Sequence, residues 1–305
     1  MRRSAAPRGV HPRQPGPRHG DRPVTAQDGP IGLIAGRGAL PVALVEEARR
    51  RGRQVVCADI FEGDPHLPQI ADAYYAIALG DLGGIVEAFR RHGVREVLLA
   101  GKVDKFPAID AAQLDAAGRS VARAARDHRD TSIMNAFLAV LEQSGFEVGS
   151  QIRYLAHLVP QPGNLGGRAP SAAEVKDIRV GLAIAARIAA LDIGQAVAVR
   201  NGAVVAVEAA EGTDAMIRRA GALAVGVVVV KVSRPQQDPR YDLPVVGPET
   251  VRALAEARGT ALAVEAGRTI LLDREQSAAA AAEAGIAVVA AASPPHEPSR
   301  PPADL

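Results

Sequence analysis

Residues 229–247 read VVKVSRPQQDPRYDLPVVG, and this segment organises the interpretation of the whole chain. An uncharged and mostly β-branched run, residues 225–230, leads directly into it and predicts a buried strand. Charged and amide side chains follow at once, and prolines restrict the backbone between them. In α/β domains, ligands bind at the loops that leave the carboxyl ends of strands. The segment is therefore either a ligand-binding loop or an ordinary solvated loop of mixed charge.

Length and composition restrict the class of protein. The 305 residues are enough for about two domains, and the hydrophobic content of 48% allows each to bury a core. A formal net charge of +2 argues against nucleic acid as a partner. The single cysteine, Cys57, excludes an internal disulfide and fits a reducing compartment. No apolar run approaches the ~20 residues that a membrane-spanning helix needs.

The first half of the chain begins with a strand, a glycine turn and a helix. The apolar run 31–35 precedes Gly36 and Gly38, and helical spacing follows over residues 40–51. This order is typical of nucleotide-binding α/β domains, but Pro41 stands where the dinucleotide fingerprint needs its third glycine. The turn is then either a phosphate or ligand loop, which we favour, or a nicotinamide site.

A second glycine turn follows the strand predicted at residues 94–100. Its Gly101-Lys102 pair lacks the other residues of a P-loop, which excludes that type of ATPase. If the sheet is parallel, Lys102 lies at the same edge as Gly36 and Gly38.

These patterns predict an α/β protein of two domains. We expect a Rossmann-like domain with a parallel sheet at residues 29–150 and a mixed α/β domain at residues 170–292. Proline and glycine gather in residues 151–169, which predicts a linker. Residues 1–28 are basic with almost no large apolar side chain, and residues 293–305 are rich in proline, so both are expected to be disordered tails.

The second domain shows clear turn and cap signals. Asn201-Gly202 between two apolar runs predicts a hairpin, and Gly267-Arg268 suggests another between residues 261–266 and 269–273. Ser171, with Glu174 three residues later, has the spacing of a helix capping box. Thr213 or Asp214 is expected to cap a helix over residues 215–220, whose N-terminus could receive a phosphate.

The available chemistry is that of carboxylates and cations. The seven histidines do not show metal-ligand spacing, and one cysteine cannot build a zinc or iron–sulfur site. Oxygen ligands would favour Mg²⁺ or Mn²⁺, and such a set suits phosphoryl transfer to water. The candidate side chains are Glu208, Glu211, Asp214, Lys231, Arg234, Asp238, Arg240 and Asp242.

Several long motifs carry a resemblance to a known family. They are GLIAGRGALP (32–41), LLAGKV (98–103), DIGQAVAVRNGAVVAVEAAEGTDAMIRR (192–219), VVKVSRPQQDPRYDLPVVGPETV (229–251) and LAVEAG (262–267). In this order they resemble the UDP-2,3-diacylglucosamine diphosphatase family of lipid A biosynthesis, the LpxI type. The resemblance covers roughly residues 30–291, and the second-domain motifs are the more specific ones.

The resemblance implies a Mg²⁺-dependent hydrolase that cleaves UDP-2,3-diacylglucosamine to UMP and 2,3-diacylglucosamine 1-phosphate. The essential aspartate of the family corresponds to Asp238. We accordingly expect Asp238, Lys231 and Arg240 to be catalytic, and Asp238, Asp214 and Glu211 to hold the metal. The expected substrate-binding residues are Gly36, Gly38, Lys102, Gln195, Thr213, Arg234 and Gln237. A peripheral place at the cytoplasmic face of the inner membrane is expected, with no nucleic-acid partner and with a homodimer as one candidate assembly.

Two other functions remain as alternatives. One is a non-catalytic protein that binds a nucleotide-sugar or lipid phosphate. It is disfavoured because a carboxylate such as Asp238 beside a bound anion would not strengthen simple binding. The other is a nicotinamide oxidoreductase, which Pro41 opposes together with the lack of a clear acid/base pair in the second domain.

Overall fold

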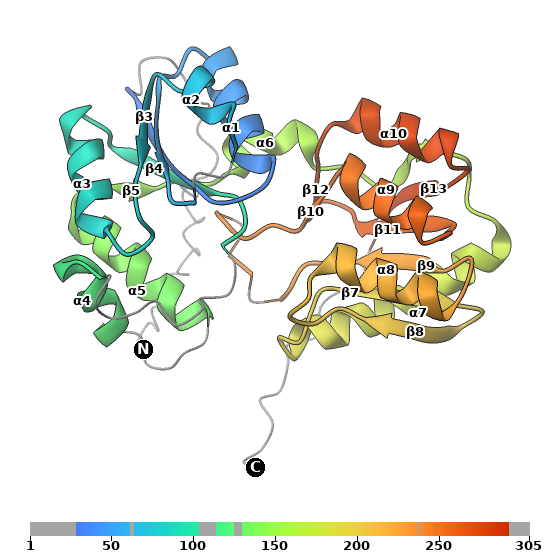
Figure 1. The fold of residues 1–305 in the computed structure, drawn as a ribbon. Coiled ribbons are helices and arrows are strands. Elements are labelled where there is room, and N and C mark those ends of the chain that lie inside the picture. The colour runs from blue at the N-terminus through green and yellow to red at the C-terminus, as the bar shows by residue number, and fades with distance from the viewer. Residues whose placement is uncertain are drawn as a thin grey trace, which may run out of the picture.

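The computed structural model describes residues 29–61, 64–103, 114–124, 130–235, 237–238 and 240–292. The expected tails, residues 1–28 and 293–305, lie outside this range. Two α/β units lie side by side, each with its own central sheet (Figure 1).

The first unit is built on a five-stranded sheet in the order β3-β2-β1-β4-β5, and all of its pairings are parallel. The strands are β1 (Ile31–Ala35), β2 (Val55–Asp59), β3 (Ala73–Ala76), β4 (Glu96–Ala100) and β5 (Glu147–Val148). The helices are α1 (Leu40–Arg50), α2 (Leu67–Ile70), α3 (Leu82–Arg91), α4 (Ala116–Ala124) and α5 (Asp130–Gln143). Every residue of β1, β2 and β4 is buried, as expected for a parallel sheet covered on both faces.

The second unit has a six-stranded mixed sheet in the order β6-β13-β11-β9-β7-β8. Its strands are β6 (Gly163–Gly167), β7 (Ala196–Arg200), β8 (Ala203–Val207), β9 (Val228–Lys231), β11 (Ala261–Glu265) and β13 (Ala287–Ala291). The central strands β13, β11 and β9 are parallel, and antiparallel strands flank them on both sides. The predicted α/β class and the predicted difference between the two sheets are confirmed.

Helices cover both faces of this second sheet. They are α7 (Ala172–Ala190), α8 (Thr213–Leu223), α9 (Pro248–Glu256) and α10 (Arg274–Glu283). Successive side chains of β9 point to opposite faces of the sheet. Val228 and Val230 pack with α7, whereas Val229 packs with α8, α9 and α10. The predicted capping box begins α7: Ser171 accepts from the Glu174 amide at 3.3 Å, and Glu174 accepts from the Ser171 amide at 2.7 Å.

The range predicted as a linker contains regular structure. It holds α6 (Ile152–Leu155), a short 3₁₀ turn (Ala156–Leu158) and β6. The glycines of β6 do not mark a flexible segment, because a Cβ on Gly166 would lie 2.6 Å from the Cα of Ala278 in α10. Close packing of the helix on the strand therefore accounts for the small residue there.

One predicted hairpin forms and the other does not. Asn201 and Gly202 have φ of 51° and 79°, and their turn joins β7 to antiparallel β8. The hairpin expected around Gly267-Arg268 is wrong: β12 (Ile270–Leu271) instead pairs in parallel with β10 (Val245–Val246). Ile270 and Leu272 explain the difference, since both are buried in the same core cluster as Leu33 of β1. Burial against the first unit outweighs the local turn signal.

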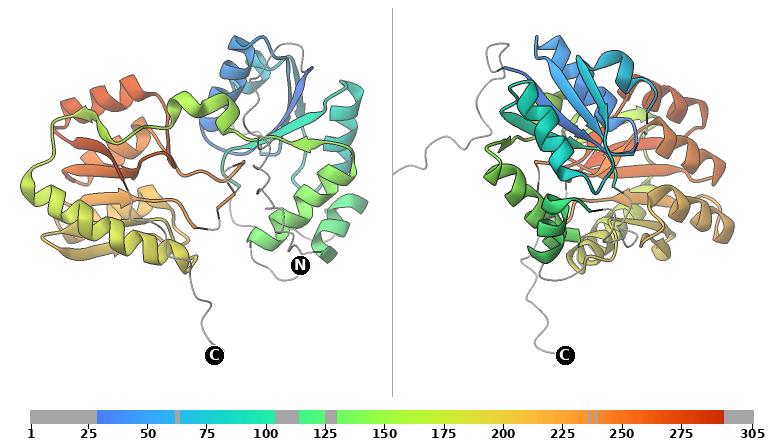
Figure 2. Two further views of the ribbon diagram at one scale, coloured as in Figure 1. Left: turned by 180° about the vertical axis from the view of Figure 1, so that it is seen from behind. Right: turned by 60° about the vertical axis from the view of Figure 1, so that its left-hand side comes forward.

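The small β10–β12 sheet lies between the two units (Figures 1 and 2). It contributes to both cores, because Ile270 packs in the core of the first unit whereas Val246 and Leu271 pack in that of the second. Within the described residues, no helix combines the length and apolar character that crossing a bilayer would require.

Candidate functional site

Lys231, the last residue of β9, lies close to the start of α8. Its Nζ donates to Thr213 Oγ1 at 3.1 Å and to the Val245 carbonyl at 3.0 Å, so both of these bonds go to neutral oxygens. Burial lowers the pKa of Lys231 below its ordinary value. The carboxylates of Glu208 and Asp214 act in the opposite direction, and the nearby Lys102 lowers the pKa further.

The start of α8 differs from the prediction. Neither Thr213 nor Asp214 caps the helix. The cap residue is Gly212, with φ of 84°, and no side chain forms a cap hydrogen bond. Thr213 Oγ1 donates instead to Glu208 Oε1 at 2.8 Å while it accepts from Lys231. This leaves the positive end of the α8 dipole uncapped by a side chain and next to the partly buried Lys231, an arrangement that attracts anions.

The first unit contributes a second lysine to the same place. Lys102 follows β4, and its backbone forms a two-bond antiparallel bridge with Arg37, at 2.8 and 2.9 Å. The turn needs glycine at position 36, because a Cβ there would lie 2.8 Å from the Lys102 carbonyl oxygen. Lys102 Nζ lies 3.6 Å from where a Cβ on Gly212 would be. Cations from both units therefore meet at the N-terminus of α8, whereas Gly38 faces open space with φ of 96°.

Asp238 is held by the arginine two residues later. Arg240 donates from Nη2 to Oδ2 at 2.7 Å and from Nε to both carboxylate oxygens at 2.9 and 3.1 Å. The backbone amide of Arg240 adds a bond to Oδ1 at 2.9 Å. Burial alone would raise the pKa of Asp238, but these bonds outweigh it and lower the pKa. Asp238 is thus a carboxylate at neutral pH.

Hydrogen bonds connect Gln195 to Arg234 and Gln237, which belong to the same loop. In the amide orientation that suits its neighbours, Gln195 donates to the Val232 carbonyl and accepts from Arg234 and Gln237 at 3.1 and 3.2 Å. The Arg234 amide donates to Gln237 Oε1 at 2.9 Å. Asp192, which the sequence did not single out, pairs with Arg234 at 3.2 Å. Three of the predicted substrate-binding residues therefore form one cluster.

The three predicted metal ligands do not come together. Glu211 pairs with Arg219 at 2.5 Å, and this hydrogen bond lowers the pKa of Glu211. Asp238 faces Arg240 as described above. Among the residues that the structure describes, no three metal-binding side chains form a group that could hold an ion. The described part of the chain thus offers single carboxylates to a cation rather than a three-ligand cage, and a bound phosphate could supply further ligands.

Comparison with known proteins gives the family. Residues 30–158 match the model of the LpxI N-terminal domain, and residues 161–289 match that of the LpxI C-terminal domain. The chain belongs to the LpxI family. A Caulobacter vibrioides relative, "UDP-2,3-diacylglucosamine pyrophosphatase LpxI", is 35% identical over 272 residues, which cover 85% of this chain and 96% of the relative. The predicted resemblance is confirmed.

Two solved structures show distant likenesses to this family member. A UDP-glucose 4-epimerase from Stenotrophomonas maltophila is 14% identical with a TM-score of 0.26, covering 47% of this chain and 40% of the epimerase. The Thermotoga maritima enzyme of the same name is 17% identical with the same TM-score, covering 47% and 41%. Likeness of this degree carries no argument about activity.

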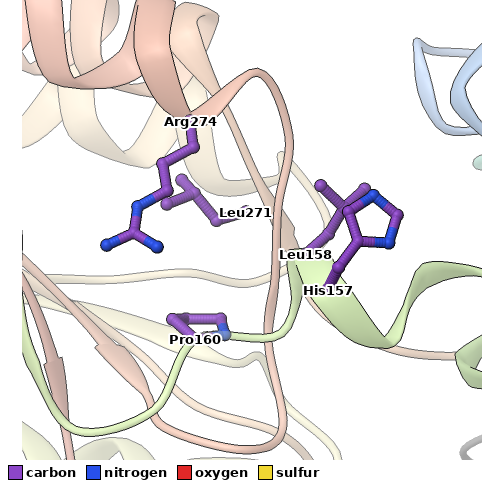
Figure 3. Close-up of a pocket in the computed structure, with 5 residues that line it drawn as sticks. All are labelled: His157, Leu158, Pro160, Leu271 and Arg274. Carbon is purple, nitrogen blue, oxygen red and sulfur yellow. The ribbon is translucent and has the colours of Figure 1, made fainter.

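A small hollow lies elsewhere on this LpxI-family chain, where the connection between the units meets the second one (Figure 3). It is lined by His157, Leu158, Pro160, Leu271 and Arg274. Its volume of about 20 Å³ suits a water molecule rather than a substrate. None of the predicted site residues lines it.

Proposed function

We propose that this protein hydrolyses the pyrophosphate bond of UDP-2,3-diacylglucosamine. Water adds to one phosphorus, the bridging P–O bond breaks, and UMP and 2,3-diacylglucosamine 1-phosphate leave as separate anions. The observation that carries the proposal is the meeting of Lys231 and Lys102, one from each unit, at the N-terminus of α8. The Caulobacter relative, similar over most of its length, supports the same reaction.

In this proposal the lysines bind the diphosphate and stabilise the charge that grows as the bond breaks. Both act with the α8 dipole; Lys102 is exposed in the free protein, whereas burial around Lys231 strengthens its electrostatic interactions. Arg240 and Arg234 add guanidinium groups suited to phosphate oxygens. Gln195, Gln237 and Thr213 supply hydrogen bonds that orient the substrate. Gly36 and Gly38 let the backbone of the first unit approach the substrate closely.

Asp238 is proposed to orient the attacking water as a hydrogen-bond acceptor. Phosphate oxygens of the arriving substrate compete for the Arg240 guanidinium, which frees a carboxylate oxygen of Asp238. Asp238 enters this step as a carboxylate, because its bonds to Arg240 lower its pKa in the free protein.

We propose that Mg²⁺ is the cofactor and would be held jointly by protein carboxylates and the phosphates of the bound substrate. Asp238 and Asp214 would supply its protein ligands, and Glu211 would need to leave Arg219 in order to join them. Mg²⁺ commonly takes one or two carboxylates and completes its shell with substrate phosphates and water. The ion would neutralise charge on the transferring phosphoryl group. We also propose that the enzyme works as a peripheral protein at the cytoplasmic face of the inner membrane, where its lipid substrate resides.

The test is direct. Purified protein, UDP-2,3-diacylglucosamine in mixed micelles and Mg²⁺ should release UMP, followed by chromatography with absorbance at the uridine maximum. Equal amounts of 2,3-diacylglucosamine 1-phosphate should appear. Tight substrate binding without UMP release would refute hydrolysis and favour the non-catalytic binding protein.

A further inference from the structure

Gln151 joins the two units at the base of the Asp238 loop. It precedes α6 and is fully buried. Its backbone amide donates to the Arg240 carbonyl at 2.9 Å, and its side-chain Nε2 donates to the Tyr241 carbonyl at 3.0 Å. The same Nε2 also donates to the Leu99 carbonyl in β4. One residue therefore holds two consecutive carbonyls of the loop and one carbonyl of the first sheet.

The hydrogen-bond partners of Gln151 lie close to candidate site residues of both units. Leu99 lies three residues before Lys102, and Arg240 is the residue that holds the Asp238 carboxylate. The amides of Asp242 and Tyr241 donate to the Asp238 carbonyl at 3.0 and 3.3 Å, so these three residues are held together as a turn. Gln151 thus connects the turn that contains Asp238 to β4, the strand that precedes Lys102.

Further contacts dock the same turn on the first unit. Tyr241 packs against the core between the first sheet and α3, α4 and α5. Burial raises its pKa to about 12, as expected for a phenol that has left bulk water. Arg240 also pairs loosely with Glu142 of α5, at 3.8 Å. The segment that leaves β9 accordingly reaches across to the first unit before it returns as β10 (Figure 1).

We propose that Gln151 is a positioning residue for the hydrolysis: it fixes the distance between the Asp238 turn and the end of β4. This inference rests on the proposed function. Both N–H bonds of its carboxamide are used, while its Oε1 is buried without a partner in the described structure. A buried amide that leaves its acceptor unsatisfied costs free energy, which is understandable where the two donors serve a geometric purpose. No sequence pattern pointed to Gln151, because it stands in the range predicted as a linker.

Gln151→Met tests the role, since it keeps the length of the side chain and removes both donors. We expect kcat for UMP release to fall on the order of 10- to 100-fold, the scale of a misplaced catalytic group, with KM within about 3-fold. In an Asp238→Ala background the same substitution should have little further effect, because two residues that act through one group are not additive. A purely structural role predicts multiplicative losses instead.

Tyr154→Phe is the matched control. Tyr154 lies on α6 and is fully buried like Gln151, but its hydroxyl bonds Glu96 and Arg53, each at 3.0 Å, away from the loop. It should lower the melting temperature and leave kcat unchanged. Equal kcat in the wild type and Gln151→Met, both folded at the assay temperature, would overturn the proposal. Should Gln151→Met not fold, Gln151→Asn takes its place, because it keeps the amide but shortens its reach and should lower kcat by a smaller factor; an unchanged kcat there also overturns the proposal.

Hydrogen exchange separates this inference from the proposed function. Without substrate, the amides of residues 240–243 should exchange faster in Gln151→Met than in the wild type, and not in Tyr154→Phe. Unchanged exchange would show that Gln151 does not anchor the turn. Wild-type protein that releases no UMP would overturn the proposed function and the kinetic role together, while the exchange result would still decide whether the anchor exists.

Discussion

Arg240 engages both carboxylate oxygens of Asp238, with Nη2–Oδ2 at 2.7 Å and Nε–Oδ1 at 3.1 Å. The central carboxylate of the loop is therefore already neutralised by a neighbour two residues away. Because phosphate is also a strong acceptor for guanidinium, a bound diphosphate can draw Arg240 away and expose Asp238. The pair thereby links substrate binding to the availability of the carboxylate.

The first prediction concerns Asp238. Asp238→Ala should lower kcat on the order of 10²-fold or more, as for loss of a key electrostatic group, measured as UMP release at saturating substrate. KM should change little, because lysines, arginines and the acyl chains supply most of the binding, and a freed Arg240 can bind phosphate. Asp242→Ala is the control, with a smaller kinetic loss and a lower melting temperature. Near-normal kcat in a folded Asp238→Ala protein, with Asp242→Ala inactive, would reverse the assignment.

The second prediction is a pH dependence that arises from Lys231. Burial lowers its pKa, so the charge that binds phosphate is fully present below that lowered pKa and is lost as the pH rises through it. Lys231→Arg keeps a positive charge at all accessible pH values and should extend the alkaline limb of kcat/KM upward. Lys176→Arg, an exposed change on α7, should leave the profile unchanged. An alkaline limb that stays in place in Lys231→Arg would assign that limb to another group.

The third prediction concerns Mg²⁺. Because the described residues form no three-ligand group, calorimetry should detect little Mg²⁺ binding to the free protein and clear binding once a UDP-sugar is present. EDTA should abolish UMP release but leave the melting temperature of the free protein unchanged. Turnover that survives exhaustive chelation would remove Mg²⁺ from the mechanism. Tight stoichiometric binding to the free protein would instead reveal a prebuilt site.

The fourth prediction concerns stability and uses the capping box of α7. Hydrogen bonds from Arg168, at 2.5 and 2.7 Å, lower the pKa of Glu174 to about 2. A lowered carboxyl pKa stabilises the fold above the ordinary glutamate value, and this stability is lost as the pH falls towards about 2. Glu174→Gln should therefore cost about 2 kcal/mol at pH 7, after allowance for the partial exposure of Arg168. The difference from wild type in urea unfolding should shrink on acidification, and a difference independent of pH would show that the charge is not its source.

Much of the fold was predictable from local patterns. The apolar run 225–230 marks the central strand β9, although the strand begins only at Val228 and Val225 lies exposed in the preceding turn. Asn201-Gly202 marks the β7–β8 turn, and Ser171 with Glu174 marks the start of α7. Each of these signals acts over a few residues, through side-chain burial, backbone φ or a cap hydrogen bond. The family motifs likewise pointed to Lys231, Lys102 and the Asp238 loop as one site.

Contacts between distant segments determined the rest. The partner of β12 depends on burial of Ile270 against the first unit, and the cap at Gly212 depends on Thr213 turning to Glu208 and Lys231. The hydrogen bonds of Gln151 form only when α6, β4 and the Asp238 turn pack together. Sequence spacing encodes which side of an element is apolar and where it begins, because those properties are local. It does not encode which distant carbonyl or carboxylate will stand opposite a given side chain, because packing of the whole chain decides that.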